Sequence, residues 1–351
     1  MEQVRVGIVG IGRLGFSHAE KLAYRIPGAK LAAICKQSGA GLREAGEALG
    51  VPSSACYTDY SRMLGQADID AVVVASPSSE HPGHIAQALE SGKHVFTEKP
   101  LGTTVAACRE AERAVYAHPE QVFMIGFMRR YDASYAYAKQ QIDAGRIGTP
   151  YLFKGTGVDP MQSVEEMLRY VKVGSGAIFS DLGTHDIDLM RWYLGEDPVE
   201  VHAIGGSYAY GRFREIGDAE AACAMFRFSS GKMALMHCGR AAAHGYHIET
   251  EIVGTAGSIH ISPVPEKNLA KLYGADGVKT ECVESFCERF DQAYLAELTE
   301  FIDCIRTKRS PAMCAADGTK AAIIALCATE SFHSGKPVTI PYDAAPGEDR
   351  K

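Results

Sequence analysis

The 351-residue sequence has neither an excess of positive charge nor a long apolar run. Its 36 lysines and arginines stand against 43 aspartates and glutamates, which gives a formal net charge of −7 at pH 7. Nucleic acids and anionic membrane surfaces both bind basic patches, so this balance argues against either partner. A membrane-spanning helix needs roughly 18 or more consecutive apolar residues, and the sequence contains no such run.

The N-terminus lacks the charged-then-apolar arrangement of a secretory signal, because residues 1–5 lead directly into a short apolar run. The ten cysteines form no C-x-x-C motif and no short cluster with histidine at the spacing of metal ligands. Most of them stand within apolar stretches. We therefore predict a cytoplasmic protein whose cysteines are small buried residues in a reducing compartment, with no structural disulfide and no metal site.

A glycine-rich turn follows the first apolar run. Residues 4–9 are β-branched and typical of a strand buried on both faces, and residues 17–24 have the pattern of a helix. The G-x-G-x-x-G motif between them allows a tight turn, close approach of a pyrophosphate and close helix–strand packing. The helix N-terminus favours the phosphate charge. We predict that this turn binds a dinucleotide through Gly10, Ile11, Gly12, Arg13, Leu14 and Gly15.

Strand and helix patterns alternate as far as residue 126, which predicts a parallel, doubly wound sheet and hence a Rossmann domain over residues 1–126. Strands are expected at 29–35, 56–57, 69–75, 94–97 and 122–126, and helices at 40–49, 84–91 and 104–117. Ligands of such sheets bind beyond the carboxyl ends of the strands. The loops at those ends add these predicted cofactor contacts: Lys36, Ser76, Pro77, His81, Glu98 and Lys99.

Lys36 stands where NAD-preferring domains usually carry an acidic residue for the ribose 2′-hydroxyl. A lysine followed by Gln37 and Ser38 suits a 2′-phosphate better, which favours NADP; the alternative is that Lys36 faces solvent. Lys99 follows a strand and precedes Pro100, so we expect it to project toward the nicotinamide, and a cis bond before Pro100 is one way to aim it. The alternative is a surface lysine at a turn.

Beyond residue 126 longer strands separated by hairpin signals predict a second, α+β domain over residues 127–316. Alternation in residues 222–228 indicates a largely antiparallel open sheet with helices on one face. The domain is expected to bind substrate and to form a homo-oligomer, a dimer or tetramer, through the other face. The strands are expected at 151–158, 199–209, 220–228, 232–238 and 247–261, with turns at 229–231 and 254–257.

Two helices are expected near the C-terminus, at 294–306 and 317–334. The second is expected to return to the first domain. Residues 344–351 are expected to be a flexible tail. The whole chain is therefore an α/β protein with a Rossmann domain and an α+β domain.

Residues 176–188 read G-A-I-F-S-D-L-G-T-H-D-I-D and place Asp181, His185 and Asp188 on one face of an expected helix. A carboxylate one turn from a histidine can orient the imidazole and stabilise its charged form, as proton transfer requires. The alternative is a helix N-terminus capped by Ser180 or Asp181, with His185 in the core. A metal held by the three residues is a further alternative by residue type, but no soft ligand stands nearby and hydride transfer needs no metal.

Three motifs in this order resemble the Gfo/Idh/MocA oxidoreductase family over essentially the whole chain. They are G-x-G-x-x-G at 10–15, E-K-P at 98–100, and a glycine followed by Asp181, His185 and Asp188 at 176–188. Within that family, residues 126–132, 245–246 and 251–254 look most like the inositol 2-dehydrogenases.

The resemblance implies NAD(P)-dependent oxidation of a secondary hydroxyl of a cyclic polyol, with myo-inositol converted to 2-keto-myo-inositol. It implies Lys99, Asp181 and His185 as the catalytic group: His185 removes the hydroxyl proton, Asp181 orients the imidazole or the substrate, and Lys99 hydrogen-bonds the reacting oxygen. These three residues and Arg129, Asp159 and Tyr246 are the implied substrate contacts. The alternatives are a structural salt bridge for Arg129, a turn at Asp159 and a core position for Tyr246.

Lys36 departs from the family, whose inositol dehydrogenases usually use NAD and carry an acidic residue there. The cofactor thus stays open between NAD and NADP. Another polyol or sugar dehydrogenase of the family, acting on scyllo-inositol or an aldose, is the nearest alternative function. A non-catalytic dinucleotide-binding sensor is the other, although a sensor has no reason to keep Lys99, Asp181 and His185 together.

Overall fold

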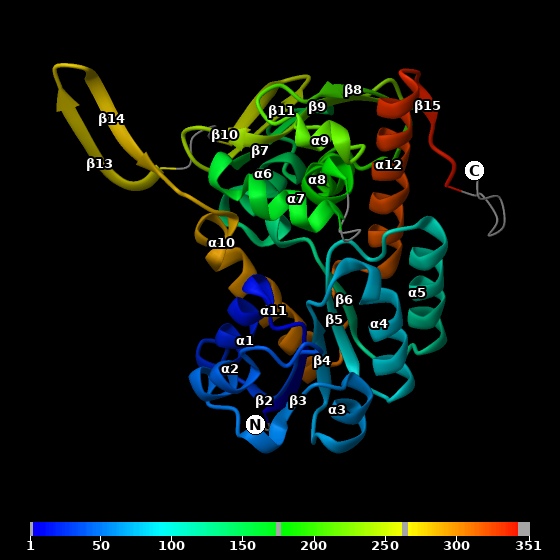
Figure 1. Cartoon of the computed structure of the whole chain (residues 1–351). Helices are drawn as coiled ribbons and strands as arrows, with labels where there is room; N and C mark the ends of the chain where they lie inside the picture. The colour runs from blue at the N-terminus through cyan, green and yellow to red at the C-terminus, as the bar shows by residue number, and fades with distance from the viewer. Residues whose placement is uncertain (1–2, 173–176, 262–265, 343–351) are drawn as a thin grey trace. The chain divides into compact units, whose positions relative to one another are not determined.

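The computed structural model describes residues 3–172, 177–261 and 266–342, and the chain divides into two compact units (Figure 1). Unit 1 comprises the described residues up to Tyr131 together with Gln292–Ala322. Unit 2 comprises the described residues of Asp132–Asp291 and those from Ile323 onward. The expected tail at 344–351 and the glycine at 176 lie outside the described residues.

Unit 1 is built on a six-stranded parallel sheet with the strand order β3-β2-β1-β4-β5-β6. The central strands β1 and β4 are almost wholly buried, as expected for β-branched runs covered on both faces. The predicted Rossmann sheet is confirmed. Its strands are β1 (Val4–Val9), β2 (Ala29–Cys35), β3 (Cys56–Tyr57), β4 (Ala71–Val74), β5 (His94–Glu98) and β6 (Phe123–Gly126).

Helices connect these strands and surround the sheet of unit 1 in Figure 1. They are α1 (Arg13–Tyr24), α2 (Leu42–Leu49), α3 (Tyr60–Gln66), α4 (His81–Glu90) and α5 (Val105–Ala117), with short 3-10 turns η1 (Ser53–Ala55), η2 (Ser78–Glu80) and η3 (Met128–Tyr131). β1 and β4 are neighbours although β2 and β3 come between them in the chain. This reversal of strand order is the switch point at which such sheets bind ligands.

Two C-terminal helices are distributed between the two units differently from the predicted domains. The helix expected at 294–306, within the second domain, is α11 (Asp291–Thr307), and from Gln292 it belongs to unit 1. Apolar packing explains this, because Phe301 lies 5.8 Å from Phe96, measured between ring centroids. The helix expected to return to the first domain, 317–334, is α12 (Ala315–Ser334), and only its part up to Ala322 belongs to unit 1.

Unit 2 is built on a seven-stranded sheet with the order β12-β11-β7-β10-β9-β8-β15. In the described part of this sheet β7 and β10 are the one parallel pair, so the predicted, largely antiparallel sheet is confirmed. The strands are β7 (Pro150–Pro160), β8 (Pro198–Gly206), β9 (Ala221–Phe228), β10 (Met233–Ala242), β11 (His247–Gly254), β12 (Gly257–Ile261) and β15 (Val338–Thr339).

One face of this sheet is covered by helices and the other is open (Figure 1). Three of these helices, α6, α7 and α9, were not predicted. Burial alternates strictly along β9, and the open face carries the exposed apolar side chains of Ile204, Met225, Met233 and Leu235. The covering helices are α6 (Ala133–Asp143), α7 (Val164–Lys172), α8 (Thr184–Leu194) and α9 (Arg212–Glu215), with the turn η4 (Met161–Ser163) before α7.

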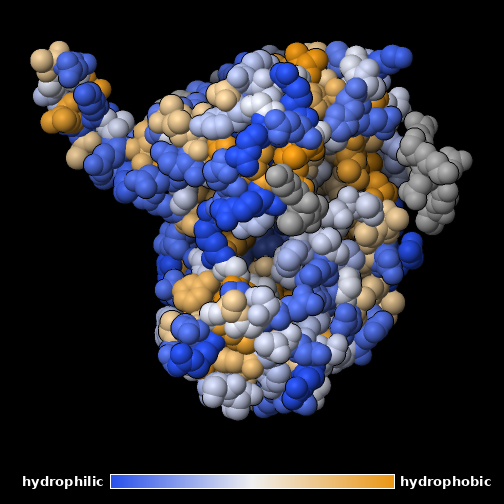
Figure 2. Space-filling model, viewed as in Figure 1, coloured by the Kyte–Doolittle hydropathy of each residue, from blue (hydrophilic) through white to orange (hydrophobic). Residues whose placement is uncertain are grey.

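A separate hairpin, which was also not predicted, is formed by β13 (Glu266–Gly274) and β14 (Gly277–Cys282) and precedes α10 (Phe286–Arg289). Every residue of β13 is exposed, and Leu269 is 92% and Tyr273 76% exposed. Figure 2 shows hydrophobic and hydrophilic residues mixed on this hairpin. A two-stranded hairpin alone is at best marginally stable in water.

The structure shows how the cysteines are distributed. The ten cysteines all lie in the described ranges and have free thiols. Five are buried, but Cys223 and Cys314 are exposed, so the prediction of buried cysteines holds only in part.

No helix in the described ranges is long and apolar enough to cross a membrane.

Candidate functional site

The glycine-rich turn of unit 1 is shaped by close backbone contacts. Gly10 has a φ of 96°, and a side chain there would collide with the carbonyl oxygen of Ala75, in the loop that follows β4. A side chain at Gly15 would collide with the carbonyl oxygen of Gly10. The two loops of the switch point are therefore packed backbone against backbone, which only glycine at these positions permits.

Gly12 differs from its two neighbours in the motif. Among the described residues, no heavy atom lies within 4 Å of the position that its Cβ would take. Helix α1 begins at Arg13 with no side-chain cap among the described residues and with no acidic residue in its first turn. The first N–H groups of the helix and its positive dipole end are thus accessible to an anion, which fits the pyrophosphate of a dinucleotide.

The loop after β4 is fixed by two histidines of α4. Ser76 Oγ lies 2.9 Å from His84 Nδ1, and the carbonyl oxygen of Ser76 lies 2.8 Å from His81 Nε2. The other nitrogen of His81 lies 2.8 Å from the carbonyl oxygen of Pro100. His81 is buried, and of the predicted cofactor contacts it is the one that holds two loops together through their carbonyl oxygens. Pro77, in the loop after β4, is exposed.

Lys36 follows β2 directly, and its backbone N–H donates to the carbonyl oxygen of Tyr57. Its side chain is half-buried, and Nζ lies 4.0 Å from the position that a Cβ on Gly41 would occupy, at the start of α2. The ammonium group therefore lies at the carboxyl edge of the sheet, as a group that contacts the adenosine ribose must.

The Glu98-Lys99-Pro100 turn ends β5. The Lys99–Pro100 peptide bond is cis, which confirms the conformation considered from the sequence. Lys99 is half-buried, and its backbone N–H donates to Glu98 Oε2 over 3.2 Å. The other oxygen of that carboxylate lies 2.7 Å from His18 Nε2. Both Glu98 oxygens are thus engaged within unit 1, although the sequence predicted Glu98 as a cofactor contact.

In unit 2, Asp181 and His185 lie on two different kinds of helix. The segment η5 (Phe179–Gly183) is a π-helix and continues into α8 from Thr184. The expected helix is present, but over residues 179–183 it is a π-helix instead of an α-helix. Hydrogen bonds of a π-helix close after five residues instead of four, so a four-residue step from Asp181 to His185 falls short of one turn. Such π-helical turns occur frequently at functional sites.

A buried arginine that the sequence analysis missed organises the acidic residues of this site. Arg240 on β10 is completely buried, and its Nη1 lies 3.0 Å from Asp181 Oδ2 and 3.3 Å from Asp159 Oδ2. Its Nη2 lies 4.0 Å from Asp218 Oδ2. One guanidinium therefore links three carboxylates that stand far apart in the chain. Arg240 is the one charged residue in the sequence of β10, and this was the available signal.

Burial and charge act against each other in this cluster. Burial lowers the pKa of Arg240, but Asp181, Asp159 and Asp218 together raise it above its ordinary value, so the guanidinium stays charged. Burial raises the pKa of Asp218, and Arg240 and the N–H of Ile178 only partly offset this. Exposure differs too: the side chain of Asp181 is 31% exposed and that of Asp218 only 3%. The side chain of Asp159 is 12% exposed, so Asp181 is the most exposed carboxylate of the cluster.

The other predicted site residues are mostly enclosed. His185 is 7% exposed on α8, and Tyr246 is 2% exposed with its ring against Phe290. Arg129 is 1% exposed on η3 of unit 1. Asp159 lies within β7 rather than in a turn, so the turn alternative for this residue was wrong.

The helix α8 is seated on β7 through glycines. A Cβ on Gly155 would come within 2.6 Å of Asp186 Oδ1, and one on Gly157 within 3.5 Å of Asp186 Oδ2. The missing side chains let the buried Asp186 carboxylate approach the strand. This contact fixes the helix that carries His185 and Asp188.

In the part of the chain that the structure describes, the side chains around Asp181 do not have the spacing of a metal site. Among the described residues, one group of three His, Cys, Asp or Glu side chains has the spacing of a metal site, and it consists of His18, Glu98 and Glu297 in unit 1.

Comparison with known proteins gives two family matches. A model described as "Oxidoreductase family, NAD-binding Rossmann fold" matches residues 4–127, and the "GFO/IDH/MocA C-terminal domain" matches residues 135–260.

Similar proteins cover nearly the whole chain. A scyllo-inositol 2-dehydrogenase (NAD(+)) of Bacillus subtilis is 33% identical over 98% of each chain. A scyllo-inositol dehydrogenase of Lactobacillus casei, solved with NAD(H) and scyllo-inositol, has a TM-score of 0.93 at 38% identity and covers 97% of this chain and 99% of its own. A myo-inositol 2-dehydrogenase of Lactobacillus plantarum has a TM-score of 0.94 at 37% identity, with 97% and 100% coverage.

Proposed function

The chain belongs to the Gfo/Idh/MocA family of NAD-binding oxidoreductases, and we propose that it oxidises a secondary hydroxyl of an inositol to the ketone. The relatives named after scyllo-inositol and after myo-inositol are almost equally similar to it, so both isomers are candidate substrates. The observation that carries the proposal is the Asp181–Arg240–Asp159 cluster, which offers a partly exposed carboxylate on a buried, charged support. Carboxylates accept hydrogen bonds from several hydroxyls of a polyol.

We propose a catalytic role for each of three residues, Lys99 of unit 1 and Asp181 and His185 of unit 2. The glycine-rich turn around Gly10 and Gly12 would hold NAD, which would supply the hydride acceptor. His185 takes the hydroxyl proton, and Lys99 hydrogen-bonds the same oxygen and stabilises its developing negative charge. Asp181 orients the imidazole or the substrate, and the Arg240 guanidinium favours the charged form of this carboxylate. Arg129, Asp159 and Tyr246 are proposed to shape the pocket, by contact or through their neighbours.

The proposal is tested with purified protein, NAD, and myo-inositol or scyllo-inositol in parallel. We expect reduced nicotinamide to accumulate with at least one isomer, as measured by its absorbance. Glucose serves as the aldose control. Tight NAD binding without turnover of any polyol would contradict the proposal and favour the sensor alternative.

Coenzyme choice gives a prediction at Lys36. Replacing it with aspartate (K36D) should raise the ratio of kcat/KM with NAD to kcat/KM with NADP by roughly tenfold or more, since a carboxylate accepts from the ribose hydroxyls and repels a 2′-phosphate. Lys30→Asp, an exposed position on β2, is the matched charge control. An unchanged ratio in K36D, measured by steady-state kinetics, would show that Lys36 does not contact the ribose.

We also propose that unit 2 mediates homo-oligomer formation through the open face of its sheet. Met225 and Leu235 are register partners on that face and are 55% and 40% exposed. An apolar pair at the centre of an exposed face favours a second copy as its cover. Met225→Glu should shift the protein to a smaller species in sedimentation, whereas Tyr116→Glu, on α5 of unit 1, should not. A wild-type monomer at micromolar concentration would exclude this interface.

The ten free thiols suit a reducing compartment, and we propose the cytoplasm as the location of the protein.

A further inference from the structure

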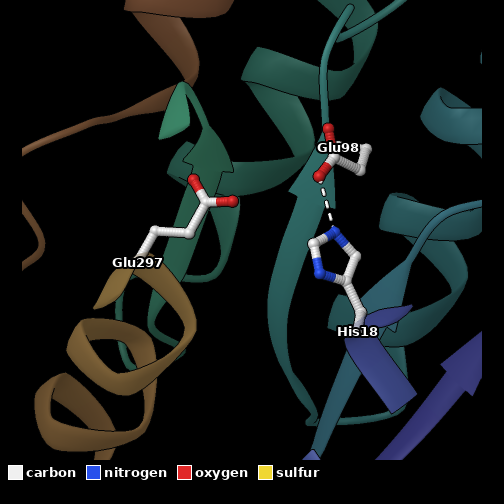
Figure 3. Close-up of side chains that lie close together, drawn as sticks. All are labelled: His18, Glu98 and Glu297. Carbon is white, nitrogen blue, oxygen red and sulfur yellow. Dashed lines mark hydrogen bonds and ion pairs between the residues drawn. The ribbon is translucent and has the colours of Figure 1, made fainter. Parts of the chain in front are cut away.

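A buried polar cluster lies behind the Glu98–Lys99 turn in unit 1 (Figure 3). His18 comes from α1, Glu98 from the end of β5 and Glu297 from α11, and they are 0%, 5% and 0% exposed. His18 Nε2 lies 2.7 Å from Glu98 Oε1, and Glu98 Oε2 accepts from the N–H of Lys99. A continuous chain of hydrogen bonds therefore runs from α1 to the backbone of Lys99.

The far end of this chain is incomplete. Within the described residues, neither His18 Nδ1 nor either carboxyl oxygen of Glu297 has a hydrogen-bond partner. Figure 3 shows the Glu297 carboxyl turned toward His18 and Glu98. One ligand atom from each of the three residues lies within 4.8 Å of the others. Because buried polar atoms are almost always paired, Glu297 and His18 Nδ1 are each other's natural partners, directly or through one water.

The surroundings of Glu297 disfavour a second negative charge. Burial and the neighbouring Glu98 raise the pKa of Glu297 well above its ordinary value, and Lys21, which is 1% exposed on α1, opposes this effect. The rings of Tyr294 and Phe96 enclose His18 at centroid distances of 5.4 and 5.9 Å. The ammonium group of Lys21 and the carboxylate of Glu98 already balance each other's charge in this buried cluster.

A metal ion is the alternative occupant, since one histidine and two carboxylates are a donor set that zinc accepts. Two ligands of a tetrahedral zinc stand about 3.3 Å apart, given metal–ligand distances near 2.0–2.1 Å. His18 Nε2 and Glu98 Oε1 are closer than this, at a hydrogen-bond distance of 2.7 Å. The buried Lys21 ammonium would also repel a cation. The contact between His18 Nε2 and Glu98 Oε1 is therefore a hydrogen bond and not a pair of metal ligands.

We propose that Glu297 is a neutral carboxylic acid that donates to His18 Nδ1, so that Glu297, His18 and Glu98 form a relay of hydrogen bonds positioning Lys99. Glu297 O–H donates to Nδ1, His18 Nε2–H donates to Glu98 Oε1, and the Lys99 N–H donates to Glu98 Oε2. No net charge is added to the interior. Glu297 and His18 are positioning residues, and their effect on turnover rests on the proposed role of Lys99.

The test compares Glu297→Gln, which keeps a neutral donor, with Glu297→Leu, which removes it. The matched control is Glu300→Gln. Glu300 lies three residues further along α11, and its carboxylate is paired with Arg309. Infrared difference spectra of wild type should contain the carbonyl band of a protonated carboxyl group, absent in E297Q and present in E300Q. Nitrogen NMR should show His18 as the neutral tautomer with its proton on Nε2.

Kinetics supply the second readout. E297Q should keep kcat within about twofold of wild type, whereas E297L should lose roughly tenfold in kcat with an unchanged KM for NAD, as loss of one buried hydrogen bond implies. The spectra need only wild type, E297Q and E300Q, so they decide the question even where E297L does not fold.

Three results would overturn the relay: no carboxylic-acid band in wild type, E297Q as damaging as E297L, or a stoichiometric divalent metal in the purified protein that E297Q loses. A protein that oxidises no polyol but retains the band and the His18 tautomer would refute the proposed function while supporting the hydrogen-bond relay.

Discussion

Replacing His185 with alanine is expected to lower kcat by about 10²–10⁴-fold, the usual contribution of a general base. The proposed cofactor contacts are residues of the glycine-rich turn and of the carboxyl ends of the unit 1 strands, and His185 on α8 is not among them. The affinity for NAD should therefore change little, as measured by nucleotide titration. A fall in kcat at nearly constant NAD affinity separates loss of proton transfer from loss of cofactor binding.

The control for this variant must remove a histidine of similar chemistry from the same unit. His237→Ala, on the open face of the sheet, should keep near-normal turnover. The pH dependence of kcat/KM gives a second criterion: the limb assigned to the base should be present in H237A and absent from the residual activity of H185A. Near-wild-type turnover in H185A would rule His185 out as the base.

The sequence predicted those parts of the fold and site that local pattern controls. The turn around Gly10 and Gly15 was predictable because tight backbone contact admits only glycine there, and the structure has those contacts. The parallel sheet of unit 1 followed from its strand–helix alternation, and the antiparallel sheet of unit 2 followed from a period of two. Both are short-range signals.

The features that the sequence did not predict depend on long-range contacts or on weak local signals. Arg240 meets Asp159 because β7 and β10 are neighbouring strands, and it meets Asp181 because η5 lies against β10, although 81 and 59 residues separate the partners. The π-helical turn at 179–183 has no distinctive composition, since apolar residues recur there much as in an α-helix. The exposed hairpin did have a signal, the Asp276-Gly277 pair, but no buried face accompanies it.

Long-range contacts also decide to which unit α11 belongs. Its sequence shows an apolar stripe but not which sheet that stripe covers. Phe301 against Phe96, and Tyr294 against His18, decide that it packs in unit 1. With it comes Glu297, a carboxyl group whose neighbours His18 and Glu98 lie far from it in the sequence.

Removing the charge of Arg240 is expected to have the largest effect on stability. Arg240→Met keeps an unbranched apolar stem but leaves Asp159, Asp181 and Asp218 close together without a cation. Breaking a buried ion pair on one side costs about 3–5 kcal/mol. Because water screens the partly exposed Asp181, we expect the lower end, about 3 kcal/mol of unfolding free energy.

The measurement is urea unfolding of wild type, R240M and R240K, with kcat/KM from the same preparations. R240K keeps the charge but loses the planar fork that reaches several carboxylates, so its stability should lie between the other two. Turnover should fall in both variants, since Asp181 loses the cation that supports its charged form.

A double variant distinguishes loss of charge balance from loss of packing. Asp218→Asn removes the most enclosed carboxylate while keeping an acceptor for the Ile178 N–H. If uncompensated charge is the cause, D218N should restore part of the stability lost in R240M, because a buried charge without its partner is what destabilises. Activity should not return, since Asp181 still lacks Arg240. An R240M protein as stable and as active as wild type would mean that the three carboxylates do not depend on Arg240.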